Sequence, residues 1–321
     1  MIEKHLSMLH SKHICVIGDV ILDVFRIGHV QRVSQEAPVP ILDIEEDNDC
    51  LGGALNVCNN ILSLGASCDI IAVIGDDYEA FRLEYLTEKH KIKKSGLIRD
   101  RQRVTTCKTR LINGDEQLLR SDREHRHPVS GVIEKKLLQQ IENILNHSDI
   151  CILQDYNKGV LTPTLIKESI RLAKEKNIPV FVDPKIENIG SYVGAFLMKP
   201  NRKEAETILK YTISTTEEAE KASGDLLKKM QCENILLTLG ADGMILRNKK
   251  QCIHIPALPL EIADITGAGD TVIAVLTALY STDLPLETCA EFANRAAAKV
   301  CEQSGIVPAT PNMLLEKTFT P

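Results

Sequence analysis

Short apolar runs rich in isoleucine and valine alternate along the chain with longer segments whose apolar residues recur at helical spacing. The runs predict strands at 13–18, 69–75, 150–153, 179–182, 195–198 and 234–238. The periodic segments predict helices at 54–64, 78–87, 163–176, 202–210, 217–230, 268–280 and 286–303. Strands that are apolar on both faces and separated by helices are typical of a mostly parallel sheet covered on each side. We therefore expect an α/β fold with a doubly wound sheet, whose ligands bind at the carboxyl ends of the strands.

Two stretches, 24–44 and 104–121, depart from this rhythm because their apolar and polar residues alternate with a period of two. In the second stretch, Asn113 and Gly114 separate two such runs, which is a strong signal for a β-hairpin. Both stretches predict a small β-lid that projects from the main sheet. Because no repeat, low-complexity tract or linker divides the chain, we expect a single domain over residues 1–321 that includes these lid segments.

The composition is that of a globular protein, with 44% hydrophobic and 26% charged residues and a net charge of −6. A negative net charge argues against broad binding to nucleic acid or to an anionic membrane surface. The ten cysteines include no C-x-x-C pair, a spacing that suits neither zinc nor a disulfide scaffold. The N-terminus lacks an apolar stretch of signal length, and no later run approaches a membrane span. We expect a cytoplasmic protein with neither nucleic-acid nor membrane partners.

Two loops near the N-terminus combine glycine with polar side chains. Asp19 and Asp23 follow the first predicted strand, where they could accept hydrogen bonds from the hydroxyls of a polyol or belong to a solvated turn. Gly52 and Gly53 precede a predicted helix that carries Asn56 in its first turn. The missing side chains would let a ligand approach the backbone, although a tight turn into a helix explains the glycines equally well.

A third loop places Asn201 and Glu204 in the first turn of a predicted helix. The two residues have the spacing of a capping box, in which each side chain bonds the backbone N–H of the other. An amide and a carboxylate could equally hold the waters of a Mg²⁺ ion. The sequence leaves both interpretations open.

The fourth loop reads Asp264-Ile265-Thr266-Gly267-Ala268-Gly269-Asp270-Thr271 and leads into a long apolar helix. Asp270 could be a helix cap, but a simple cap requires neither the two glycines nor the Asp264/Thr266 pair. The glycines would allow backbone N–H groups to converge on an anion. If that anion is a phosphoryl group in transfer, Asp270 is placed to take the proton of the attacking hydroxyl. The chain has no P-loop, and Val272 occupies the position of the third small residue of a dinucleotide fingerprint.

Four motifs, G-D-x-x-x-D, G-G-A-x-x-N, N-x-x-E and D-x-T-G-A-G-D-T, follow one another in this order. This order resembles the ribokinase-type (PfkB) carbohydrate kinases over nearly the whole chain. Segments 32–40, 154–159 and 183–185 are similar to the kinases of bacterial D-glycero-β-D-manno-heptose 7-phosphate. That resemblance implies ATP-dependent phosphorylation at O1, giving the heptose 1,7-bisphosphate used for ADP-heptose and lipopolysaccharide cores. Many such kinases are fused to a nucleotidyltransferase, and because the chain shows no H-x-G-H-type signature we expect a stand-alone kinase.

The resemblance also implies roles for individual residues. Asp270 would be the catalytic base, and the backbone from Gly267 through Ala268 and Gly269 would form the anion hole with it. ATP and Mg²⁺ would be bound by the residues Asn201, Glu204, Thr238, Gly240, Gly243, Asp264, Thr266 and Asn294, with Mg²⁺ held through water by the first two. The sugar would be held by the residues Asp19, Asp23, Gly52, Gly53, Asn56 and Asp155. The resemblance further admits K⁺ as a cofactor and implies a homodimer formed through the lid.

A phosphorylated substrate requires fixed cations, and the predicted lid supplies Lys108, Arg110 and Arg120. Further candidates are Arg32, Lys158 and Lys185, although charges that alternate along an exposed strand are also typical of a solvated face. Gln35, Asn157 and Ile186 depart from the pattern that the resemblance leads us to expect, which concerns the exact sugar more than the reaction. Two alternatives stay open: another sugar or nucleoside kinase of this fold, and a binding regulator without turnover. The unbroken motif around Asp270 argues against the regulator.

Overall fold

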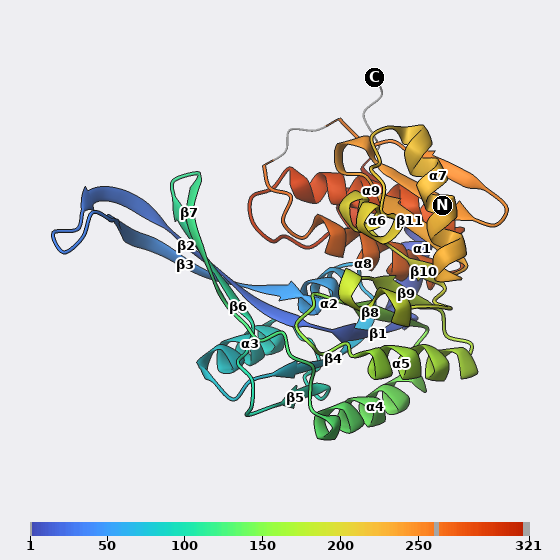
Figure 1. Cartoon of the computed structure of the whole chain (residues 1–321), viewed down its shortest axis with the longest axis horizontal. Helices are drawn as coiled ribbons and strands as arrows, with labels where there is room; N and C mark the ends of the chain where they lie inside the picture. The colour runs from blue at the N-terminus through green and yellow to red at the C-terminus, as the bar shows by residue number, and fades with distance from the viewer. Residues whose placement is uncertain (1, 260–262, 317–321) are drawn as a thin grey trace.

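The main sheet of the computed structural model, which describes residues 2–259 and 263–316, has the strand order β13-β12-β11-β10-β9-β8-β1-β4-β5 (Figure 1). Its pairs are parallel from β5 through β11, and β12 and β13 continue it as antiparallel neighbours. The strands are β1 (His13–Gly18), β4 (Ser67–Ile74), β5 (Leu97–Arg99), β8 (Ile150–Gln154), β9 (Val180–Asp183), β10 (Leu197–Met198), β11 (Asn234–Thr238), β12 (Met244–Asn248) and β13 (Cys252–Ile255).

Helices cover both faces of this sheet. Successive residues of a strand point to opposite faces, so Ile14 and Val16 of β1 pack into one core cluster while Cys15 and Ile17 pack into the other. The α-helices are α1 (Ile2–Met8), α2 (Ala54–Ser63), α3 (Tyr78–Lys89), α4 (Gly131–Leu145), α5 (Pro163–Glu175), α6 (Arg202–Leu209), α7 (Thr216–Met230), α8 (Ala268–Tyr280), α9 (Leu286–Cys301) and α10 (Pro311–Leu315). Short 3₁₀ turns are η1 (Leu9–Ser11), η2 (Ile186–Ser191) and η3 (Gly240–Asp242). The first cluster includes α2, α8 and α9, and the second includes α4, α5 and α7.

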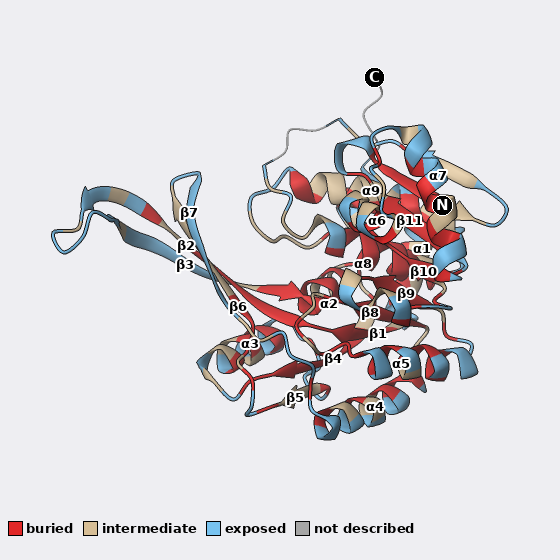
Figure 2. Ribbon diagram, viewed as in Figure 1, coloured by how far each residue is buried: buried red, intermediate tan, exposed pale blue. Residues whose placement is uncertain are grey.

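A second sheet of four strands, in the order β3-β2-β6-β7, projects from the main body (Figure 1). Its strands are β2 (Val20–Val33), β3 (Pro40–Gly53), β6 (Cys107–Asn113) and β7 (Glu116–Arg123). The base of β2 and β3 is buried and their far ends are exposed, as Figure 2 shows by the change from red to pale blue. Gly114, with φ 59°, lies in the turn between β6 and β7. This is the β-lid that the alternating segments predict, and we refer to β2, β3, β6 and β7 as the lid.

The predicted α/β fold is confirmed, and several elements extend or add to it. Strand β2 begins and strand β3 ends closer to the core than predicted, because both are buried on both faces at their base, where the period-two pattern disappears. Gly52 and Gly53 therefore end a strand instead of forming a separate loop. Helix α4 and the hairpin of β12 and β13 are absent from the sequence prediction.

The ten cysteines are all unpaired; eight are buried and two, Cys50 and Cys252, are half-buried. This agrees with the expectation that most of them act as small core residues. Among the described residues, no helix has the length and apolar character needed to cross a membrane.

Candidate active site

Asp270 lies in the first turn of α8 and is bonded by Gln154, the last residue of β8, so it lies where the parallel strand β8 ends. The helix begins after Gly267, whose φ of 82° is in the left-handed region that favours glycine. The Asp270 carboxylate accepts hydrogen bonds from Asn56 Nδ2 at 2.9 Å, Gln154 Nε2 at 3.0 Å and the Tyr156 hydroxyl at 2.6 Å. Side chains from α2, β8 and the loop after β8 therefore fix its position, which a simple helix cap would not require.

Burial raises the pKa of Asp270 from its ordinary value of 3.8 to about 6. Hydrogen bonds from Tyr156 and Asn56 lower this pKa, while the nearby charge of Asp183 raises it further. A general base is most effective when its pKa lies near the working pH. Asp270 is thus ionised at neutral pH yet able to accept a proton from a bound hydroxyl.

We expect Tyr156→Phe to move the acid limb of the pH–rate profile to higher pH by about one unit. The Tyr156 hydroxyl donates to Asp270 and stabilises its anion, so its removal raises the pKa of the base. The pH dependence of kcat/KM measures this shift. Tyr211→Phe removes a hydroxyl that donates to Asp225, far along the chain from the site, and should leave the limb in place. An acid limb unchanged in Tyr156→Phe would contradict the assignment of Asp270 as the titrating base.

Gln154 connects Asp270 to a second carboxylate. Its Nε2 donates at 3.0 Å to both Asp270 and Asp183, and Asp183 is ion-paired with Lys199 Nζ at 3.1 Å. A Cβ on Gly269 would lie 3.4 Å from that same Nζ, so Lys199 reaches the first turn of α8. A buried ammonium therefore adjoins the start of the helix, where an anion would also be favoured by the helix dipole.

Fewer backbone N–H groups are free to form the expected anion hole than the sequence suggests. The Ala268 N–H donates to the Ile265 carbonyl oxygen at 3.2 Å and is already used. Among the described residues, no acceptor bonds the N–H groups of Gly269 and Asp270, as is usual in the first turn of a helix. These two N–H groups and Lys199 remain as donors for a phosphoryl group.

A cavity of about 950 Å³ opens beside Asp270 and is lined by Gly267, Ala268 and Gly269 at the start of α8. The structure brings the following predicted nucleotide residues together in its wall: Asn201, Thr238, Gly240, Gly243 and Asn294. Apolar residues complete the wall, including Leu258, Val272 and Ala297. A mainly apolar cavity of this size with a few polar groups is typical of a nucleotide-sized ligand site.

Asp264 and Thr266 lie in the loop that precedes α8 and do not line this cavity, although Ile265 between them does. The Asp264 carboxylate accepts from the Thr266 N–H at 2.8 Å and from the Gly305 N–H at 3.2 Å. These bonds hold the loop in shape. The cofactor role of this pair stays a prediction.

Asn201 and Glu204 form the capping box of α6: Asn201 Oδ1 accepts from the Glu204 N–H, and the Glu204 carboxylate accepts from the Asn201 N–H, both at 2.9 Å. The other Glu204 oxygen is ion-paired with Lys185. An ionised carboxylate offers about four lone-pair sites, so two remain for the waters of a metal ion. The residues therefore fit Mg²⁺ bound through water, and the capping and metal interpretations are compatible.

Two aspartates predicted to bind sugar instead accept hydrogen bonds from other residues of the protein. The buried Asp19 carboxylate accepts the N–H groups of Tyr156, Lys158 and Val160, at distances of 2.9–3.1 Å. Burial raises the pKa of Asp19 to about 6, with the charge of Asp155 as the next cause. Asp155 is bonded by the Asn157 N–H, the Asn188 side chain and the Tyr192 hydroxyl. These contacts favour a role in shaping the loop that carries Tyr156, and direct sugar contacts by Asp19 and Asp155 stay predictions.

Asp23 and Gly52 meet at the base of the lid. Arg110 Nη1 donates to Asp23 Oδ1 at 2.6 Å, and a Cβ on Gly52 would lie only 1.9 Å from Asp23 Oδ2. Gly52 is thus required for the close approach of the carboxylate. At Gly53, which caps α2 with φ 60°, a Cβ would lie 2.5 Å from the Asp19 carbonyl oxygen.

The candidate phosphate-binding cations differ in whether a carboxylate already pairs with them. Arg110 pairs with Asp23, Arg120 with Asp122, Lys158 with Glu124 and Lys185 with Glu204, and the more distant Arg32 with Asp43 near the lid tip. Lys108 has no carboxylate within ion-pair distance among the described residues, and its Nζ lies 5.6 Å from the centre of the Tyr156 ring. Burial lowers the pKa of Lys108; the charges of Asp23 and Asp122 oppose this shift, and those of Lys158 and Arg120 add to it. Lys108 is therefore the cation of this group that most needs an anion.

Sequence reasoning assigned no role to Gln154, Tyr156, Asp183 or Lys199, which surround Asp270. A signal for two of them lies in segments 154–159 and 183–185, because Gln154 and Asp183 end the neighbouring strands β8 and β9. Polar residues at the carboxyl ends of adjacent parallel strands meet at one edge.

The model of the "pfkB family carbohydrate kinase" matches residues 11–313. Curated relatives include the "Bifunctional protein HldE" of Aliarcobacter butzleri, 38% identical over 311 residues, which covers 96% of this chain and 65% of that protein. The protein of the same name from Trichlorobacter lovleyi is 35% identical over 312 residues, covering 97% of this chain and 64% of that one. The chain thus spans less than two thirds of the length of either relative.

Two solved structures share the fold. Phosphofructokinase-2 from Escherichia coli, in complex with substrates and products, superposes with a TM-score of 0.80 at 17% identity, covering 95% of this chain and 97% of that one. Ribokinase from Thermotoga maritima superposes with a TM-score of 0.71 at 22% identity, covering 95% of this chain and 98% of that one.

Proposed function

The chain belongs to the pfkB family of carbohydrate kinases, and from this membership we propose that it transfers the γ-phosphate of ATP to O1 of D-glycero-β-D-manno-heptose 7-phosphate. The product would be the heptose 1,7-bisphosphate that leads to ADP-heptose for lipopolysaccharide. The relatives named HldE, 35–38% identical over nearly the whole chain, support this substrate. The observation that carries the proposal is the position of Asp270, which is held by three side chains beside a nucleotide-sized cavity.

The geometry supports an in-line transfer in which Asp270 accepts the proton of the sugar hydroxyl. The hydroxyl oxygen then forms a bond to the γ-phosphorus while the bond from that phosphorus to the β–γ bridging oxygen breaks, leaving ADP. Tyr156, Gln154 and Asn56 hold the carboxylate in one orientation throughout. The N–H groups of Gly269 and Asp270, with Lys199, are placed to bind the charge that develops on the transferred group.

Asn201 and Glu204 are the residues we propose for Mg²⁺, which when bound would neutralise the phosphate charges of ATP. K⁺ is a second proposed cofactor, for which a neighbouring structure of Escherichia coli phosphofructokinase-2 in complex with potassium offers support. Use of ATP and ten unpaired cysteines favour a cytoplasmic location.

We expect Glu204→Gln to raise the Mg²⁺ concentration needed for half-maximal rate several-fold, because a neutral amide attracts a hydrated cation less strongly. Glutamine preserves the capping bond, so the fold should persist. Glu218→Gln is the matched control, since Glu218 occupies the same position in the capping box of α7. Rate measurements across a Mg²⁺ series compare the variants. Equal Mg²⁺ dependence in both would leave Glu204 as a cap alone.

We further propose that two copies associate through their lids. The lid extends beyond the main body (Figure 1) and exposes Val33, Ile44 and Leu119 on strands β2, β3 and β7. A relative of this fold, phosphofructokinase-2 from Escherichia coli, has a tetrameric form. Light scattering of the intact chain should give the mass of a dimer, and Leu119→Arg should reduce it to that of a monomer. A wild-type chain that is monomeric at working concentration would refute this association.

The proposed reaction is tested by measuring ADP release from ATP with a panel of sugars and sugar phosphates that includes the heptose 7-phosphate. We expect the highest kcat/KM with the heptose 7-phosphate, and little turnover of the unphosphorylated heptose. Preference for an unphosphorylated sugar or a nucleoside would replace this substrate with another of the same family.

A further inference from the structure

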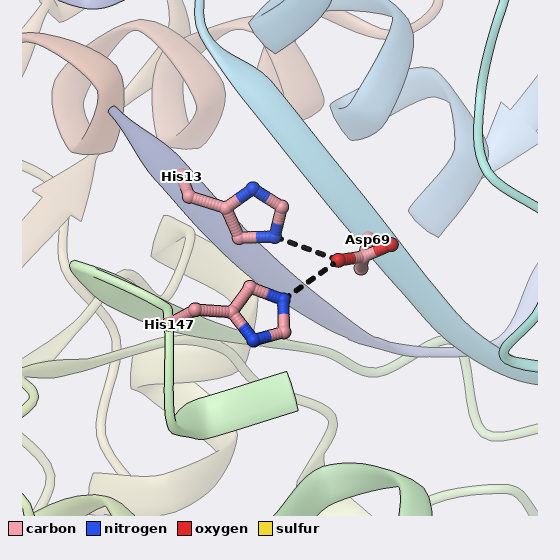
Figure 3. Close-up of side chains that lie close together, drawn as sticks. All are labelled: His13, Asp69 and His147. Atoms are coloured by element: carbon pink, nitrogen blue, oxygen red, sulfur yellow. Dashed lines mark hydrogen bonds and ion pairs between the residues drawn. The ribbon is translucent and has the colours of Figure 1, made fainter. Parts of the chain in front are cut away.

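Three potential metal ligands meet at the edge of the main sheet opposite Asp270. His13 begins β1, Asp69 lies near the start of β4, and His147 follows α4 and precedes β8 (Figure 3). One ligand atom from each lies within 4.8 Å of those of the other two. Because β1 runs from His13 to Gly18 at about 3.3 Å per residue, this cluster lies roughly 15–20 Å from the candidate active site. Its residues belong to none of the motifs that define the kinase.

The three side chains converge on one oxygen. His13 Nε2 lies 2.7 Å from Asp69 Oδ2, and His147 Nε2 lies 3.3 Å from the same atom (Figure 3). The side chain of Asp69 is 6% exposed and that of His13 is 12% exposed, whereas that of His147 is 54% exposed. The cluster is therefore anchored in the protein on one side and open to solvent on the other.

A contact behind His13 allows its ring to present a lone pair to a metal. Ser67 Oγ lies 2.9 Å from both His13 Nδ1 and the Lys12 carbonyl oxygen, so its hydrogen can bond Lys12 while the Nδ1–H bonds Ser67. In that arrangement Nε2 carries a lone pair that faces a carboxylate oxygen, and only a cation makes such a contact favourable. Metal-bound histidines usually donate their other ring N–H in this way.

Electrostatics disfavour a proton as that cation. Burial lowers the pKa of His13, and although Asp69 opposes this effect, the nearby charges of His147 and Lys93 add to it. This shift favours the neutral form of the His13 ring, which is the form that binds a metal.

We propose that His13, Asp69 and His147 bind a divalent transition metal of the zinc type, with water in the fourth position. Two imidazole nitrogens and one carboxylate oxygen suit zinc and its neighbours and not Mg²⁺ or Ca²⁺, which take oxygen ligands. Metal–ligand distances of about 2.0–2.2 Å in a tetrahedron separate ligand atoms by roughly 3.3 Å. The 3.3 Å contact already has this spacing, and the 2.7 Å contact has to open by about 0.6 Å. The metal would join β1, β4 and the end of α4, and its role would be structural.

The test titrates the intact, chelator-treated protein with Co²⁺ in the absence of nucleotide and Mg²⁺. We expect one Co²⁺ per chain, with the visible absorption of a tetrahedral nitrogen–oxygen site, and displacement of this absorption by Zn²⁺. A hundredfold excess over Kd should raise the Tm by roughly 5 °C. His147→Ala should weaken Co²⁺ binding by at least about tenfold, because even the loss of a residue that only supports a metal ligand can have an effect of that size. Because the His147 side chain is half-exposed, its removal should not disturb the fold. An unchanged Tm of the metal-free variant checks this.

His29→Ala is the matched control. The side chain of His29 is 55% exposed and lies 3.6 Å from a carboxylate oxygen of Glu45, but no second histidine in the described part of the chain joins that pair. The His29→Ala variant should bind Co²⁺ as tightly as the wild type does. Ser67→Ala should weaken binding because it removes the partner of His13 Nδ1 while all three ligands stay in place. Absence of stoichiometric binding, or equal binding by wild type and His147→Ala, would overturn the proposal.

Discussion

Asp270→Asn is expected to lower kcat by a factor on the order of 10²–10⁴, with the KM values for ATP and sugar phosphate within a few-fold of wild type. Asparagine has the shape of aspartate but cannot accept the hydroxyl proton. Because a base acts only as the transition state forms, its loss affects kcat and not ground-state binding. Steady-state kinetics with both substrates varied measure the separation of kcat from KM.

The fold of Asp270→Asn needs its own measurement, because the site differs from an exposed cap. The three groups that bond Asp270 are all donors, so the new amide nitrogen must face one of them. Such a mismatch costs about 1–3 kcal/mol, which is more than the change of a cap alone. Thermal unfolding and nucleotide binding measure whether the variant tolerates this cost, and we expect a folded protein that binds ATP. Activity within a few-fold of wild type would remove Asp270 from the mechanism.

Lys108→Ala is expected to raise KM for the sugar phosphate by about tenfold or more while KM for ATP stays nearly fixed. A charge-assisted hydrogen bond to a phosphate contributes about 1.5–3 kcal/mol. Lys108 is half-buried beside Tyr156, and no described carboxylate pairs with it, so its charge is free for the substrate. Steady-state kinetics with the sugar phosphate and with ATP measure the two KM values. Lys108→Arg keeps the charge and should recover part of the affinity.

Arg120→Ala is the matched control for Lys108→Ala, because it also removes one lid cation. Its side chain is 51% exposed and already pairs with Asp122, so we expect a smaller effect. Arg110→Ala is less informative, since it leaves the buried Asp23 carboxylate without its partner. Unchanged KM for the sugar phosphate in Lys108→Ala, Arg110→Ala, Arg120→Ala and Lys185→Ala together would contradict a phosphate site formed by these cations.

The sequence predicted the parts of this molecule that depend on local pattern. Period-two alternation located the lid, and the glycines around Asp270 located the start of α8 with the correct first residue. Helix α4 was not predicted, although Ile133, Leu137 and Ile141 have helical spacing and pack in the core. The segment lies between two stretches rich in polar residues, so its apolar positions alone did not favour a helix over a loop.

The partners of Asp270 could not be predicted in the same way, because they depend on how strands align across the sheet. Gln154 reaches Asp270 because β8 pairs with β1 and ends beside Gly18. Lys108 and Arg110 are alternate residues of one predicted lid segment, so their side chains are expected on the same face. The sequence could not show that Asp23, which lies on the adjacent strand β2, pairs with Arg110, nor that no described carboxylate lies within ion-pair distance of Lys108. Such pairing is a property of the assembled lid.

The central claim is that this chain phosphorylates O1 of a heptose that already carries a phosphate at O7. Its most direct test is ³¹P NMR of the reaction of the purified chain with ATP, Mg²⁺ and D-glycero-β-D-manno-heptose 7-phosphate. We predict a new phosphorus resonance coupled to the anomeric proton, formed in equal amount with ADP, while the 7-phosphate resonance persists. Consumption of ATP without an anomeric phosphate, or no reaction with this sugar under conditions in which another sugar is phosphorylated, would contradict the account.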